Sequence, residues 1–236
     1  MNSIPDRTIL RVVGMAIALV VLAIPSFSQT VLPPIAEYHG RAEGMVELRN
    51  DGDIPLAVLV SAKGFTVDEE GHMLYTELDP SVTVDFGSSS FVIPPRQSHM
   101  VFYKAKISKP PYWFAILSTF TKATPVKNEI RVNVVLPHVV YLYQKHALKK
   151  QDVELALDPG EKQGSVRLEV RNKTDKAGRV ETVECKGFEK EALSGGIPVF
   201  PNKSRFLTIE TGTPHADARC KVNFEEGFSL ETMLRR

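Results

Sequence analysis

The residues of this 236-residue chain that could do chemistry are scattered along it. Its histidines lie at positions 39, 72, 99, 138, 146 and 215, and no two have the spacing of paired metal ligands. The sequence contains no nucleophile elbow, phosphate-binding loop, dinucleotide-binding glycine pattern or zinc-protease motif. The run Asp68-Glu69-Glu70 lacks the alternating carboxylates of a calcium loop, so we interpret it as a solvated hairpin tip. We therefore expect a protein that is not an enzyme and uses no metal or cofactor.

The two cysteines, Cys185 and Cys220, could react with each other. Both lie in strand-like segments, and Cys220 shares one face of an alternating run with Val222 and Phe224. In an oxidising compartment a lone pair usually forms a structural disulfide, although two free buried thiols are the alternative. A bridge closing a loop of about 35 residues is worth roughly 3–4 kcal/mol of stability. A redox motif is excluded because the sequence contains no C-x-x-C.

The first 28 residues are typical of a secretory signal peptide. Arg7 and Arg11 precede an apolar run, and Ser26 and Ser28 supply small residues for cleavage, which we expect between Ser28 and Gln29. The apolar run, residues 12–24, is too short to span a hydrocarbon core of roughly 30 Å as a helix. An uncleaved anchor is the alternative. We expect the mature chain to be periplasmic or secreted, with no membrane insertion after cleavage.

The mature chain carries no excess of charge. Removal of residues 1–28 takes Arg7, Arg11 and Asp6 from the 29 basic and 28 acidic residues, which leaves 27 of each. Nucleic-acid binding needs a basic surface, so this balance argues against a nucleic-acid partner. It argues equally against electrostatic docking to anionic lipid.

Short alternating runs separated by turns predict an all-β protein. Residues 45–49 and 55–62 flank the turn Asn50-Asp51-Gly52-Asp53, and similar spacing continues along the chain. We predict two immunoglobulin-like β-sandwich domains in tandem, residues 29–147 and a smaller domain at 148–236, joined near Lys149. In the second domain we predict a loop around Gly195-Gly196 and Pro198, and a tail that is either strand or short helix.

The best candidate for a binding surface is the long segment 129–145. Its even positions form an apolar row, and its odd positions become apolar toward the end, at Val135, Val139, Tyr141 and Tyr143. Pro137 cannot donate a ladder hydrogen bond, so the segment is an edge strand, bulged, or broken there. An exposed apolar edge is a template for β-augmentation by another chain. The alternative is a strand buried between the two domains.

The chain resembles the pilus-assembly (PapD-like) periplasmic chaperones, which have two immunoglobulin-like domains and cap fimbrial subunits. The order and spacing of several motifs over residues 31–145 carry the resemblance: Tyr38-His39-Gly40, Leu48-Arg49-Asn50, Phe91-Val92-Ile93-Pro94-Pro95, residues 112–117, and Tyr141-Leu142-Tyr143-Gln144-Lys145. In that family an arginine and a lysine clamp the subunit's terminal carboxylate. The matching positions here are Ile35 and Val140, with His138 nearby, and neither is basic. Arg131 and Asn133 stand where the resemblance implies groove-filling apolar side chains.

We therefore expect a chaperone-like protein that binds an exported, pilin-like subunit by β-strand augmentation through Val135, Val139, Tyr141 and Tyr143. The alternative is a structural or interaction module of the cell envelope with the same fold and no chaperone activity.

Overall fold

The computed structural model describes residues 29–124, 132–188, 193–210, 212 and 214–235. The predicted signal peptide, and residues 129–131 of the predicted binding segment, lie outside the described residues. The described chain is built from strands and one short 3-10 helix, and none of its helices has the length and apolar character needed to cross a membrane. The elements are β1 Gln29–Leu32, β2 Ile35–His39, β3 Ala42–Asn50, β4 Leu56–Val67, β5 Met73–Thr76, β6 Val82–Phe86, β7 Ser90–Ile93, β8 Ser98–Ile107, β9 Tyr112–Lys122, β10 Val134–Tyr143, η1 Lys150–Asp152, β11 Val153–Pro159, β12 Ser165–Asn172, β13 Gly178–Phe188, β14 Leu193–Val199, β15 Ser204–Glu210, β16 Pro214–Phe224 and β17 Ser229–Met233.

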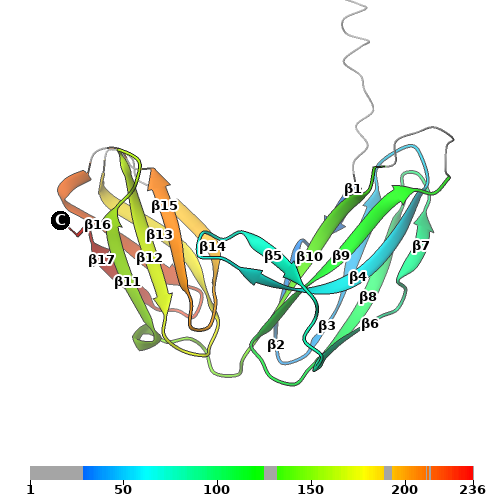
Figure 1. The fold of residues 1–236 in the computed structure, drawn as a ribbon, viewed down its shortest axis with the longest axis horizontal. Coiled ribbons are helices and arrows are strands. Elements are labelled where there is room, and N and C mark those ends of the chain that lie inside the picture. The colour runs from blue at the N-terminus through cyan, green and yellow to red at the C-terminus, as the bar shows by residue number, and fades with distance from the viewer. Residues whose placement is uncertain (1–28, 125–131, 189–192, 211, 213, 236) are drawn as a thin grey trace, which may run out of the picture.

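The first sandwich packs the sheet β1-β3-β8-β6 against the sheet β2-β10-β9-β4-β5, in which β7 also pairs with β4 (Figure 1). In β8 the alternation is simple: Val101 and Tyr103 are buried in the core, and Phe102 between them is exposed. β9 is apolar on both faces because both are covered. Phe114 lies in the sandwich core, and Ala115 lies in a second cluster that faces the other sandwich.

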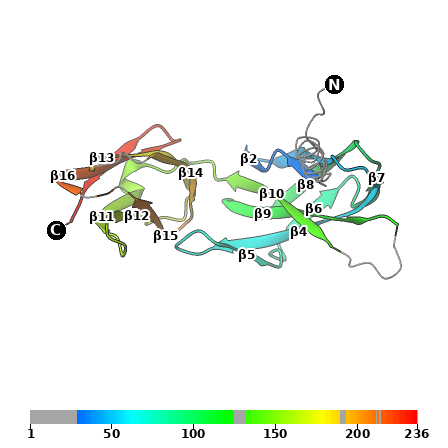
Figure 2. The same ribbon diagram turned by 90° about the horizontal axis from the view of Figure 1, so that it is seen from above.

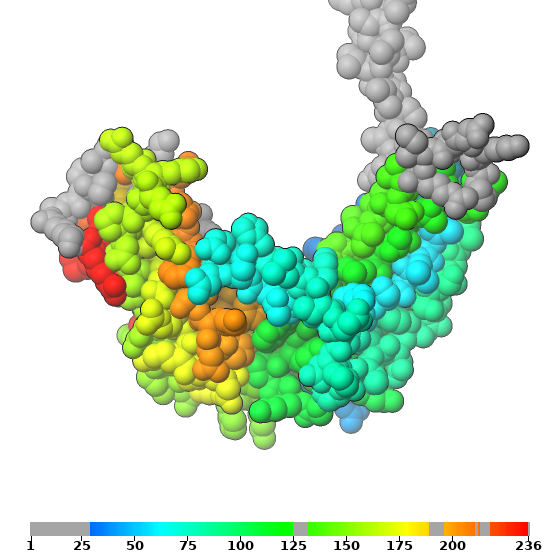
Figure 3. Space-filling model, in the orientation of Figure 1, coloured from blue at the N-terminus to red at the C-terminus, as the bar shows by residue number. Residues whose placement is uncertain are grey.

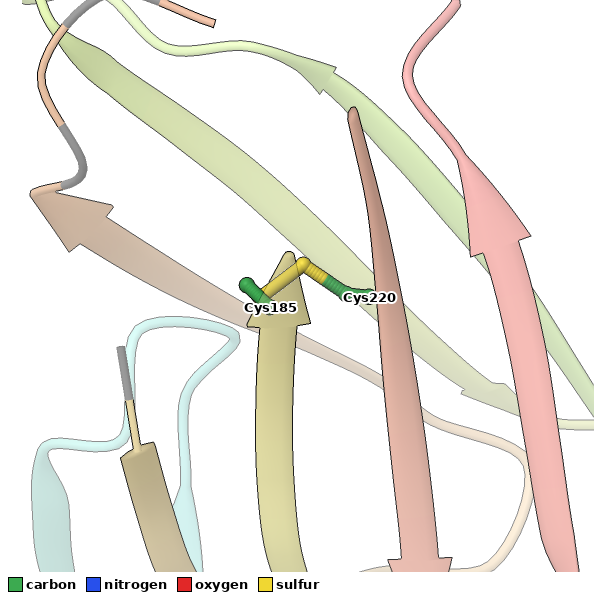
Figure 4. The surroundings of a disulfide bond; sticks show 2 residues. All are labelled: Cys185 and Cys220. Atoms are coloured by element: carbon green, nitrogen blue, oxygen red, sulfur yellow. A yellow bond between two sulfur atoms is a disulfide. The ribbon is translucent and has the colours of Figure 1, made fainter. Parts of the chain in front are cut away.

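The second sandwich packs β11-β12-β15 against β14-β13-β16-β17. The predicted all-β fold with two sandwiches is therefore confirmed. The disulfide is also confirmed: Cys185 on β13 and Cys220 on β16 are cross-strand neighbours, and both are buried (Figure 4). The expected loop around Gly195-Gly196 and Pro198 is wrong, because these residues form β14 and pair with β13. Within the tail, residues 229–233 are strand.

One flank of the second sandwich is closed where β11 meets β17. Leu157 forms a parallel bridge with Leu234, and the main-chain N–H of Arg235 donates to the Leu157 carbonyl at 2.9 Å. These contacts join the edges of the two sheets.

The sandwiches lie end to end, and the β4–β5 hairpin reaches from the first toward β15 of the second (Figures 1 and 2). The space-filling view shows the hairpin lying against the second sandwich below a concave opening (Figure 3). Glu69 and Glu70 at the hairpin tip are exposed, as expected, but the tip also contacts the second sandwich. Asp68 caps the turn by accepting the N–H groups of Gly71 and His72, and the Arg205 guanidinium reaches the carbonyls of Asp68 and Glu69, each at 3.4 Å.

The strands of the first sandwich end at Tyr143 and those of the second begin at Val153. Leu148, between them, packs into the core of the second sandwich. The domain boundary at residues 147 and 148 stays a prediction.

Candidate functional site

The strand β10 has two halves with different neighbours. Over most of its length it pairs antiparallel with β9. On its other side, Val139–Tyr143 pair in parallel with Ile35–His39 of β2. The exposed edge that we expected at Val139 and Tyr141 is therefore wrong, because these residues are paired on both sides. Among the described residues, only the first half, 134–138, has no strand on its second side.

The directions of the main-chain groups follow from one hydrogen bond. The N–H of Val139 donates to the carbonyl of Pro34, on the β2 side, at 2.8 Å. Main-chain groups alternate in direction along a strand, and the register with β9 is continuous, so residues 135 and 137 also point away from β9. The open half-edge thus offers the N–H and C=O of Val135 and the C=O of Pro137.

Pro137 is well placed on this edge. Its missing N–H falls on the open side, so the ladder with β9 loses no hydrogen bond and β10 runs unbroken through the proline. Of the three predicted alternatives, the edge strand is the one observed. The proline also removes one donor from the open edge, which shortens the template available to another chain.

Only one of the four predicted binding side chains is accessible. Val135 is 48% exposed, whereas Val139, Tyr141 and Tyr143 are each 7–8% exposed. These three pack in an apolar cluster between the sandwiches together with Phe65, Ala115, Ala177 and Phe200. The expectation that all four meet a partner is corrected: for the last three, burial between the domains is what the structure shows.

Polar contacts hold the same junction. Arg179 of β13 forms an ion pair with Glu37 of β2, with 3.1 Å between Nε and Oε1. The Tyr143 hydroxyl donates to the same Glu37 oxygen at 2.8 Å. Burial, and then the Glu37 carboxylate, raises the pKa of Tyr143, so its hydroxyl keeps its proton and acts as the donor. Gln144 adds a reciprocal pair of hydrogen bonds with the main chain of Ala177.

The two positions that the resemblance aligns with a carboxylate clamp are apolar in different settings. Ile35 is exposed at the start of β2, and Val140 is buried in the first core. The neighbouring His138 is completely buried, and its ring nitrogens contact the Pro33 carbonyl and the Tyr103 hydroxyl. Burial lowers the pKa of His138, so the imidazole is neutral near pH 7. Neither position nor His138 supplies a cation for a partner's carboxylate.

Exposed apolar side chains accompany the open half-edge. Val135 lies on β10 and Val132 shortly precedes it, and Leu32 and Ile35 flank the passage from β1 to β2. Asn133 is exposed between the two valines, and Arg131 lies outside the described residues. Among the described residues no group of three His, Cys, Asp or Glu side chains could hold a metal ion. The arrangement is suited to adding a strand with apolar side chains.

Sequence reasoning missed Arg179 and the role of His138. Arg179 gave no signal, because a basic residue at a strand start is ordinary. His138 did give one: it falls in the even, core-facing row of β10, where a polar side chain needs buried partners.

No family model matches the sequence, and no curated protein matches it. Solved structures do match the fold. The class 5 fimbrial chaperone CfaA has 10% identity and a TM-score of 0.54, covering 89% of this chain and 100% of its own. A structure of the Salmonella enterica SafA pilin with the SafB chaperone matches with 16% identity and a TM-score of 0.53, covering 90% of this chain and 99% of that chain.

The CsuC–CsuE chaperone and tip-subunit complex of Acinetobacter baumannii is similar at 14% identity and a TM-score of 0.52, covering 89% of this chain and 100% of that chain. At these identities the likeness concerns the fold. Across nearly its whole described length, this chain therefore has the two-sandwich fold of the chaperone-usher pilus chaperones, as the resemblance in its sequence implied.

Proposed function

We propose that this protein is an exported, chaperone-like binder that takes up a β-strand of another exported polypeptide along the first half of β10. The observation that carries the proposal is the half-edge at Val135 and Pro137, which pairs with no second strand among the described residues and is flanked by exposed apolar side chains. Main-chain hydrogen bonds supply affinity, and alternate side chains of the added strand supply specificity. The matched SafB and CsuC chaperones are in complexes with a pilin and a tip subunit, which supports a subunit of that kind as the partner.

The compartment is part of the same proposal. The basic and apolar pattern of residues 1–28 supports export to the periplasm or beyond. The buried Cys185–Cys220 disulfide supports an oxidising compartment as the working location.

The apolar side chains of Ile35 and Val140 limit how a bound strand can be held. Without basic side chains at these positions, the bound strand is held by its main chain and its apolar side chains, not by a clamp on its terminal carboxylate. An amidated and a free-acid version of the same subunit segment are expected to bind alike.

The test uses Val135→Asp and measures suppression of aggregation of a purified pilin subunit. A charge at position 135 would lie beside the apolar side chains of the added strand on the same sheet face, so protection should be lost. Val92→Asp is the matched control, because Val92 is 54% exposed on β7 and lies away from the β10 edge. Equal protection by Val135→Asp and the unaltered protein would refute the proposal.

A second candidate is a structural module of the cell envelope without chaperone activity. The observation that favours it is the internal use of Val139–Tyr143, which β2, β9 and the second sandwich cover. Under this alternative neither Val135→Asp nor Val92→Asp alters any chaperone activity, because the unaltered protein itself fails to protect the subunit.

A further inference from the structure

A chain of buried and partly buried polar groups crosses the first sandwich behind the open half-edge. The His138 Nδ1 lies 2.6 Å from the Pro33 carbonyl oxygen, and its Nε2 lies 2.9 Å from the Tyr103 hydroxyl. The Tyr103 hydroxyl in turn lies 2.8 Å from that of Tyr38. The chain thus links β10 to the passage from β1 to β2, to β8 and to β2 itself.

The donor and the acceptor in each of these hydrogen bonds follow from the Pro33 carbonyl at one end of the chain. A carbonyl oxygen only accepts, so Nδ1 of His138 carries the hydrogen that is donated to Pro33. In the neutral ring Nε2 then accepts from the Tyr103 hydroxyl, and the Tyr103 oxygen accepts from the Tyr38 hydroxyl. Every member is satisfied only if His138 is the Nδ1–H tautomer.

The segment that His138 contacts has few other ways to be held. Pro33 and Pro34 are consecutive, and neither has an N–H to donate. Both residues are also exposed, so their rings contribute little buried packing. Both main-chain carbonyls are held by hydrogen bonds: that of Pro33 accepts from the His138 ring, and that of Pro34 accepts from the Val139 N–H. Adjacent residues of β10 therefore hold both.

The same point on β10 separates its two halves. From Val139 onward β2 covers the edge, and before His138 the edge is open among the described residues. The residue of β10 at which β2 begins to pair therefore sets how many β10 residues remain unpaired and available to an added strand.

We propose that His138 is a positioning residue that anchors the Pro33 carbonyl and so fixes where β2 takes over the edge of β10, which sets the length of edge left open to a partner strand. The significance for a partner rests on the proposed function. The anchoring itself does not, because it concerns contacts within this chain.

Amide hydrogen exchange on the full chain, measured by NMR, tests the anchoring with a built-in reference. The N–H groups of Val139, Tyr141 and Tyr143 point toward β2, whereas those of Val140 and Leu142 point toward β9. Loosening of β2 speeds exchange in the first set alone, and general destabilisation speeds both sets.

Two substitutions separate the two ring nitrogens. His138→Asn keeps a donor near the Nδ1 position, and His138→Gln places its amide near the Nε2 position. We expect His138→Gln to speed exchange at Val139, Tyr141 and Tyr143 by about fivefold or more relative to Val140 and Leu142, the effect of losing one net hydrogen bond. We expect His138→Asn to leave that ratio close to the value of the unaltered protein.

Equal acceleration of both amide sets in His138→Gln, or the same ratio in both variants, would overturn the proposal. If either variant fails to fold, the ring nitrogen spectrum of the unaltered protein decides: the Nδ1–H tautomer supports the anchor, and the Nε2–H tautomer refutes it. None of these readouts involves a partner, so their failure is distinct from a failure of the Val135→Asp test of function.

Discussion

Phe206 of β15 donates its main-chain N–H to the carbonyl oxygen of Glu69, at the tip of the β4–β5 hairpin, over 2.9 Å. The bond joins a strand edge of the second sandwich to a hairpin of the first. Together with the Arg205 contacts to Asp68 and Glu69, it makes the hairpin a strap between the sandwiches. The angle between the sandwiches is therefore held at two separated places, this strap and the junction around Glu37 and Arg179.

Arg205→Ala should loosen this strap. The side chain holds two carbonyls of the hairpin tip, so its removal exposes the Phe206–Glu69 bond to water and to local opening. We expect faster amide exchange at Phe206 and a broader distance distribution in small-angle X-ray scattering. Arg219→Ala is the control, since Arg219 forms an exposed pair with Glu231. An unchanged Phe206 exchange rate in Arg205→Ala would contradict the strap.

Arg179→Met should destabilise the junction between the sandwiches. It removes the cation beside Glu37 while keeping a long apolar side chain against the aromatic cluster. Removing one partner of a fully buried pair costs about 3–5 kcal/mol, and the partial exposure of Glu37 reduces this to roughly 2 kcal/mol. Urea unfolding measures the change. As a control, Arg219→Met should lower the free energy of unfolding by less than about 1 kcal/mol, as for exposed ion pairs. An equal loss in the two variants would contradict a stabilising role of the Arg179–Glu37 pair.

Reduction of the disulfide should lower stability mainly in the second sandwich. Cys185–Cys220 closes a loop with a sequence separation of 35, so its loss should cost about 3 kcal/mol. Urea unfolding with and without a thiol reductant gives the difference. The double variant Cys185→Ala with Cys220→Ala serves as control, because its unfolding curve should not respond to reductant. A midpoint unaffected by reduction of the unaltered protein would contradict this prediction.

The lowered pKa of His138 predicts that the stability of the folded protein depends on pH. Burial lowers this pKa in the folded protein, so below the ordinary value of about 6.5 the unfolded chain binds a proton that the folded chain does not. The contribution of His138 to the free energy of unfolding is fully present above that value. It is lost as the pH falls toward the pKa of the folded state, at up to about 1.4 kcal/mol per pH unit. Unfolding between pH 7 and 5 should show this slope in the unaltered protein and a smaller one in His138→Asn. Equal slopes of the unfolding free energy against pH in the two proteins would show that folding does not change the pKa of His138.

Gly44→Ala should disrupt the polar chain in the first core. A Cβ at this position would lie directly against the Tyr38 hydroxyl and close to that of Tyr103. Overpacking of this kind costs about 1–3 kcal/mol, measured by thermal or urea unfolding. Gly87→Ala is the control, because its Cβ would meet atoms no closer than 3.7 Å. A larger cost for Gly87→Ala than for Gly44→Ala would contradict this account of the core.

The sequence was sufficient to predict which side chains face a core. The face shared by Cys220, Val222 and Phe224 was expected and all three are buried, because side-chain direction follows the twofold period of a strand. The same rule was insufficient at Gly195-Gly196, where local turn signals favoured a loop but pairing with β13 produces a strand.

The neighbours of a strand could not be predicted in this way. Residues 139–143 are apolar on both faces, which fits an exposed apolar edge as well as a buried strand. Nothing local reveals that Ile35 and Glu37, far away in the sequence, run in parallel beside Val139 and Tyr141. Parallel pairing depends on the path of the chain through Pro33 and Pro34, which is a property of the assembled sandwich. Consequently the unpaired edge lies on the strand that the sequence indicated, but farther from the hinge than we expected.

The closed flank of the second sandwich has a consequence for self-assembly. Leu157 is engaged both by its bridge to Leu234 and by the Arg235 N–H, so an incoming strand finds these docking groups occupied. Unprotected strand edges are the usual starting points of amyloid-like stacking. For a protein proposed to meet unpaired strands of other chains, sealing this flank helps to confine recruitment to the first sandwich and to keep copies of the protein from polymerising through the second.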